Sequence, residues 1–145
     1  MKELSQKFVD LVEKNATKLT ERVMSDIKKH PGTPTYRTYD EKLVYDRVFN
    51  VYHQFGKWMS TQTTAEDIRK VYTALGKQRR QEGFALSEVI QTLIIARRHI
   101  WLLVESEGYL DTALDLRLAI DLINRSVLFF DRAIYFTAIG FEGKD

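Results

Sequence analysis

Cysteine is absent from the 145-residue sequence, so disulfide bonds, thiolate metal sites and a cysteine nucleophile are excluded. Helix-breaking residues are also scarce, because the chain has only 2 prolines and 7 glycines and both prolines lie in the segment 30–34. Long uncharged runs are missing too: within the most apolar segment, the longest is Val89 to Ala96. This run is far shorter than the ~20 residues that cross a bilayer, so a membrane span is excluded.

Charge of one sign is not in excess, since 22 Lys and Arg face 20 Asp and Glu. The basic residues are spread along every segment, which disfavours a nucleic-acid partner. The amino terminus has no apolar run of the kind that a signal peptide needs, so we expect a cytoplasmic protein. A hydrophobic share of 44% and an aromatic share of 12% are enough for one domain, residues 1–145, with a substantial core.

Apolar residues recur at intervals of three and four, and this spacing predicts an all-α fold of five helices. The expected helices cover residues 2–29, 40–59, 65–82, 83–105 and 111–139. We expect Asp40 to cap the second helix, Thr63 and Glu66 to form a capping box for the third, and Gly83 to end it. The segment 82–104 is the most apolar and should be central. The last helix would be ~40 Å long, which exceeds what one small core requires and predicts apolar surface for a partner.

No catalytic motif is present: we find no G-x-S-x-G elbow, no phosphate-binding loop and no dinucleotide fingerprint. The histidines at 30, 53 and 99 lack the spacing that brings two ligands onto one helix face, so we expect no protein-only metal site. Glu88 and Asp131 are carboxylates that either act in acid–base chemistry or pair with an arginine. Asp131 lies among apolar residues, so we expect partial burial and a partner among Arg97, Arg98 and Arg132. The pairs Arg79-Arg80 and Arg97-Arg98 form an anion-binding patch if their helices are antiparallel; otherwise they are solvated or paired.

Two stretches resemble a known family. Residues 75–90, continuing through the segment from Ala96 to Trp101, are similar to the "G..R...G..L.EV......LR" pattern in the N-terminal domain of the RsbT co-antagonist (RsbRD) family. Residues 128–136, centred on Asp131, resemble the closing helix of that family. The likeness covers about Leu75 to Phe141, roughly half of the chain.

The resemblance implies a globin-like sensory module of the stressosome type. Such domains lie upstream of STAS or histidine kinase output domains, are usually dimeric and do without haem. The chain contains no output domain, so it is either an excised fragment or a free-standing member. We therefore expect a non-enzymatic sensor that forms a homodimer through its first and last helices and relays a signal along the last one.

We expect a ligand pocket between the second and central helices, near Tyr52, His53, Phe55, Arg97 and Trp101. One alternative is a haem-binding gas sensor in which His53 or His99 is the axial ligand. Another is a scaffold that has no ligand. An enzyme is the least favoured reading, because no nucleophile and base can be paired.

Overall fold

The computed structural model describes the backbone of residues 2–107 and 110–144, and within these ranges the regular structure is helical, as predicted. Side chains are described from residue 6 onward. The elements are α1 (Lys2–Lys14), α2 (Ala16–Lys29), the short 3-10 helix η1 (Pro34–Arg37), α3 (Glu41–His53), α4 (Phe55–Met59), α5 (Ala65–Gln81), α6 (Leu86–Glu107) and α7 (Ala113–Phe141).

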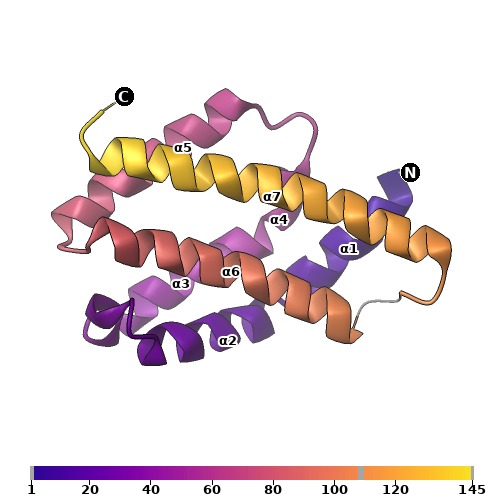
Figure 1. Cartoon of the computed structure of the whole chain (residues 1–145), viewed down its shortest axis with the longest axis horizontal. Coiled ribbons are helices and arrows are strands. Elements are labelled where there is room, and N and C mark those ends of the chain that lie inside the picture. Colours follow the sequence, from indigo (N-terminus) through magenta and orange to yellow (C-terminus); the bar gives the residue numbers. More distant parts are fainter. Residues whose placement is uncertain (1, 108–109, 145) are drawn as a thin grey trace.

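The helix α6, which the sequence singled out as the most apolar segment, lies between α2 on one side and α7 on the other, as Figure 1 shows. On average α7 is the more apolar of the two helices, so that expectation is wrong. Helix α6 also packs against α1 and α5, so its predicted central position is confirmed for the described residues. The last helix, α7, runs along most of the long axis of the molecule and packs most extensively against α5. The long C-terminal helix predicted from the sequence is therefore present, with 29 residues.

Two of the five predicted helices are each divided in two, so the expectation of unbroken helices over 2–29 and 40–59 is wrong. The first break is at Asn15, whose side-chain Nδ2 donates to the Leu11 carbonyl oxygen over 2.8 Å. Asparagine competes in this way with the backbone pattern of a helix. The second break is at Gln54, and just after it the Gly56 N–H donates to Oε2 of Glu13 on α1 over 2.8 Å. The change of direction thus allows α4 to dock on α1.

The predicted helix ends are mostly confirmed. The Asp40 carboxylate accepts a hydrogen bond from the Leu43 N–H at the start of α3. Gly83 has a φ of 93°, a left-handed conformation that favours glycine after a helix. The capping box of α5 is shifted by one residue from our expectation, because it is formed by Thr64 and Asp67 rather than by Thr63 and Glu66.

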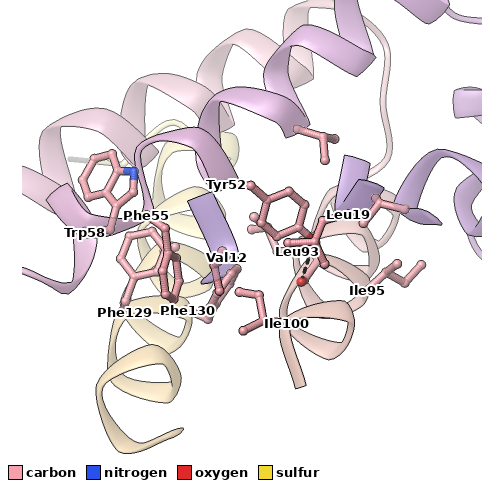
Figure 2. Packing of buried hydrophobic residues seen from close by; sticks show 14 of the residues in the cluster. Val12, Leu19, Tyr52, Phe55, Trp58, Leu93, Ile95, Ile100, Phe129 and Phe130 are labelled. Atoms are coloured by element: carbon pink, nitrogen blue, oxygen red, sulfur yellow. Dashed lines mark hydrogen bonds between the residues drawn. The ribbon is translucent and has the colours of Figure 1, made fainter. Parts of the chain in front are cut away.

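The core is one cluster to which every α-helix contributes, and Figure 2 shows part of it from close by. An aromatic group at one end joins α4, α5 and α7: Trp58 stacks on Phe129 with ring centroids 5.2 Å apart, and Tyr72 meets the Phe129 edge at 5.7 Å. This packing fixes α7 against α5 and, through Phe130, against the interior of the domain.

Candidate functional site

A cavity of about 70 Å³, partly open to solvent, lies between α3, α5 and α6, and Tyr36 of η1 and Phe130 of α7 also line it. Most of its wall is apolar; the aliphatic part comprises Val44, Val48, Val51, Leu75, Val89, Leu93 and Ala96. The polar side chains in the wall are Tyr36, Arg47, Tyr72, Arg79 and Thr92. A small, mostly apolar space that contains a few polar groups is typical of small-molecule sites.

A cluster of three charged residues joins α3 to the end of α5 beside this cavity. Arg47 donates two hydrogen bonds to the Glu82 carboxylate, with Nη1 2.8 Å from Oε1 and Nη2 2.5 Å from Oε2. Arg79 also reaches Oε1 of Glu82, over 3.4 Å, and its Nη1 donates to Gln78 over 3.0 Å. Only 8% of the Arg79 side chain is exposed. Two arginines therefore share one carboxylate at the cavity wall.

The protonation equilibria of these groups reflect the shared carboxylate. Burial lowers the pKa of Arg79, and the positive charge of Arg47 lowers it further, against the opposing attraction of Glu82. Burial alone would raise the pKa of Glu82, but the hydrogen bonds from Arg47 and the charges of both arginines outweigh it, so the pKa falls below its ordinary value. The site thus carries more positive than negative charge in a poorly solvated position.

Glu88 holds η1 in place and so positions Tyr36 in the cavity wall. Its Oε2 accepts the Thr35 N–H and its Oε1 accepts the Thr35 hydroxyl, each over 2.7 Å, and Oε1 also accepts the Ala85 N–H over 3.2 Å. The residue is 5% exposed. Within the described residues it accepts these bonds rather than pairing with an arginine, and it anchors a loop to the start of α6. Burial raises the pKa of the Tyr36 hydroxyl, so this group stays a neutral donor.

A cavity does lie between the second predicted helix and the central one, but four of the expected pocket residues lie elsewhere. Tyr52 and Phe55 are fully buried in the core, where Figure 2 shows them, and the Tyr52 hydroxyl donates to the Ala96 carbonyl oxygen over 2.7 Å. Trp101 is half-buried and packs against the core from outside. Arg97 forms an ion pair with Asp131, with Nη1 3.5 Å from Oδ1. None of the four lines the cavity.

The histidines considered for the haem alternative do not line the cavity either. His53 is exposed on α3 and stacks on Phe49, with ring centroids 5.2 Å apart. His99 is buried, with its Nε2 2.5 Å from Oδ2 of Asp26, and its Nδ1 has no hydrogen-bond partner among the described residues. The residues around this cavity therefore do not fit a haem. Within residues 2–107 and 110–144 no cluster of three metal-ligating side chains occurs.

The expectation that Asp131 is partly buried is wrong, because 63% of its side chain is exposed. The anion patch from the two arginine pairs does not form as one surface. Arg79 is buried beside Glu82, and Nη1 of Arg80 donates to the Phe141 carbonyl oxygen over 2.8 Å. Arg79 instead connects α5 to its own end, Arg80 connects α5 to α7, and Arg97 connects α6 to α7.

Sequence reasoning missed the ion pair between Arg47, which lines the cavity, and Glu82, which lies beside it. Their numbers differ by 35, and nothing in the spacing of either helix indicates that they meet. The nearest available signal was a solitary arginine on the side of α3 that is otherwise apolar, next to Val44 and Val48.

The outer face of α7 is a second surface of interest. Its most exposed large apolar side chains are Leu116, Ile120, Leu128 and Tyr135, which are 50%, 57%, 51% and 60% exposed. At ~100° per residue these positions fall within about one third of the helix circumference. The helix therefore packs into the core on one side and presents an unpartnered apolar face on the other.

Fold and site together define a class: a domain whose described regular structure is helical, with a small and partly open cavity, a charged cluster beside it and a helix that exposes apolar side chains. None of its described helices is long and apolar enough to span a bilayer. No family model, curated protein or solved structure matches the chain.

Proposed function

We propose that this chain is a non-enzymatic sensor domain that forms a homodimer through α7 and relays a change of state to an output domain. The observation that carries the proposal is the position of α7. Phe130 lines the cavity from one side of this helix, and Ile120 and Leu128 face outward from another side. A change in the cavity therefore acts on the same rigid element that bears the partner surface.

The exposed face of α7 is self-complementary. Seven of the ten exposed positions of this helix lie along one narrow stripe, at intervals of four, three, four, four, three and four residues, and this series reads the same in both directions. The other three exposed positions, Leu114, Leu116 and Arg125, lie beside the stripe. When two α7 helices lie antiparallel with Asn124 on a two-fold axis, the facing pairs are Ala113 with Tyr135, Arg117 with Asp131, and Ile120 with Leu128. The first pair matches a small side chain with a large one, the second a positive charge with a negative one, and the third two apolar side chains. This pairing favours a second copy over another partner.

The resemblance to the RsbT co-antagonist family supports the output side of the proposal. A STAS domain or a histidine kinase is the kind of output domain that such a module controls. The sequence also predicts that the first helix takes part in the dimer interface. The exposed face of α7 does not support that part of the prediction.

Cross-linking at the two-fold axis tests the dimer. Because the chain has no cysteine, the variant Asn124→Cys carries a single thiol, and the antiparallel arrangement places the two thiols of a dimer within disulfide reach. We expect mild oxidation at micromolar concentration to convert most of this variant to a covalent dimer. The matched control is Asn50→Cys, an exposed position on α3 that should stay monomeric on a denaturing gel. Equal cross-linking of the two variants, or a monomer in sedimentation equilibrium, would contradict the proposal.

A further inference from the structure

The cavity is partly open to solvent, and the space inside it accommodates only a few atoms. An engineered apolar cavity of ~150 Å³ holds benzene, so a cavity of about 70 Å³ suits a ligand of roughly three to five non-hydrogen atoms. Water is poorly suited to most of this space, because a buried water needs two to four polar partners and most of the wall is aliphatic. The occupant should therefore have a short apolar body.

The charges at the wall define the other end of the occupant. Arg47 has both of its terminal nitrogens on Glu82, whereas the hydrogen bonds of Arg79 within the described chain all come from Nη1. A guanidinium has five N–H donors in a planar fork, so Arg79 retains capacity for a carboxylate. It lines the cavity and is almost completely buried. Both nearby carboxylates already have partners. Glu82 is shared by the two arginines, and Glu88 accepts hydrogen bonds from Thr35 and Ala85.

The pKa of Arg79 is lowered by the burial of its guanidinium and by the positive charge of Arg47. Its positive charge is poorly solvated and is repelled by Arg47, and a second anion would relieve both effects. A neutral ligand of the same shape would relieve neither.

We infer that the cavity binds a short aliphatic monocarboxylate, of about two or three carbons, whose carboxylate pairs with Arg79 and whose chain lies against Val48, Val89 and Phe130. This assignment rests on the proposed sensor function and supplies its ligand class. The bound anion rebalances the charges between α3 and α5 and fills the space beside Phe130 on α7.

A titration series tests the assignment on the full chain. Sodium acetate, propionate, butyrate and hexanoate are compared by calorimetry and by the shift in melting temperature, at constant ionic strength set with sodium chloride. We expect binding to be strongest for acetate or propionate and weaker for butyrate and hexanoate, which exceed the cavity. Acetamide and propionamide, which have nearly the same shape without the charge, should bind at least tenfold more weakly.

Matched variants locate the bound group. Arg79→Gln should weaken propionate binding by roughly ten- to a hundredfold, because a charge-assisted hydrogen bond is lost. Arg98→Gln removes an exposed arginine of α6 and should leave binding unchanged. If Arg79→Gln fails to fold by circular dichroism, Val48→Leu serves instead, because it narrows the cavity and should weaken propionate more than acetate.

Several outcomes would overturn the assignment: no binding by any of the four carboxylates, equal binding of the amides, or affinities that neither Arg79→Gln nor Val48→Leu changes. The Asn124→Cys cross-link, measured in parallel, separates the two proposals. A dimer that binds no carboxylate refutes the ligand class alone, whereas a monomer that binds propionate refutes the dimeric sensor alone.

Discussion

At the scale of single residues, Glu82 links the two arginines that line the cavity to the end of α5. Its carboxylate accepts hydrogen bonds from Arg47 on α3 and from Arg79 on α5. Without it, two arginines would face each other in a poorly solvated place. Removal of one partner from such a cluster costs more than the cluster gains as a whole, since the remaining charges are left uncompensated.

The first prediction concerns the pH dependence that Glu82 contributes. Its pKa is lowered below the ordinary value of 4.5, so its contribution to the free energy of unfolding is complete above about pH 4.5 and is lost as the pH falls through the lowered pKa. We expect Glu82→Gln to destabilise the protein by about 1–3 kcal/mol at pH 7 and to flatten its loss of stability below pH 4.5. Urea unfolding between pH 7 and pH 3 measures both effects.

Glu105→Gln is the control for this prediction, because Glu105 is an exposed carboxylate on α6 and should change neither quantity appreciably. A variant Glu82→Gln whose stability falls with acid as steeply as that of the wild type would show that the cluster does not hold the ionised carboxylate in the way described here.

Residue-level features of the site were the hardest to predict from the sequence. Tyr52 and Phe55 were assigned to a pocket because they lie on the inward side of their helix, and periodicity does not separate a side chain that fills the core from one that borders a cavity. Arg47 and Glu82 meet only through tertiary packing. Asp131 has apolar neighbours in the sequence, yet these point to other sides of α7 and leave the carboxylate in solvent.

Among the described helices, α5 and α7 pack most extensively, and their backbones approach closely at two glycines. A Cβ atom on Gly140 would lie 2.0 Å from the Thr73 carbonyl oxygen, and one on Gly76 would lie 2.1 Å from that of Thr137. Both neighbours are backbone atoms of a helix, so neither can move without shifting the whole element. Glycine at these two positions therefore sets the distance between α5 and α7.

The second prediction is that Gly140→Ala destabilises the protein by about 2–3 kcal/mol, although alanine favours helices by about 1 kcal/mol over glycine. The two helices must separate to admit the methyl group. Gly56→Ala is the comparison, because its new Cβ would meet side-chain atoms of Glu13 and Val9, at 3.0 Å and 3.1 Å, rather than backbone atoms of a neighbouring helix. Thermal unfolding compares the variants, and equal melting temperatures for the two would contradict the close crossing.

The helix ends that neighbouring residues determine were predicted well. The break that accompanies the packing of α4 on α1 was not predicted. Asp40 and Gly83 act on the residues beside them, so the sequence alone indicates the start of α3 and the end of α5. The break between α3 and α4 at Gln54 is accompanied by a hydrogen bond from the Gly56 N–H to the Glu13 carboxylate. These two residues are 43 positions apart in the sequence. No local pattern contains that information.

At the scale of the whole molecule, the exposed face of α7 remains without a partner in one copy of the chain. Two copies related by an axis at Asn124 would bury Ile120 against Leu128 twice, and each interface would also contain two pairs of Arg117 with Asp131. Apolar contacts supply most of the free energy of such an interface, and the charges select the antiparallel orientation over the parallel one.

The third prediction is that Ile120→Glu yields a folded monomer. Ile120 is 57% exposed, so the substitution costs the isolated domain little, whereas in the dimer it buries a carboxylate against Leu128 of the second copy. Sedimentation equilibrium should show a dimer for the wild type and a monomer for the variant. Because dimerisation stabilises the folded state by mass action, the melting temperature of the wild type should rise with protein concentration and that of the variant should not.

Ala74→Glu provides the control, since it places the same charge at an exposed position of α5 and should leave the dimer intact. The reciprocal variant Leu128→Glu should behave as Ile120→Glu does, because the two residues face each other across the axis. If only one of the two disrupted the dimer, the antiparallel register about Asn124 would be wrong even though α7 formed the interface, and a parallel or offset pairing of the two helices would have to replace it.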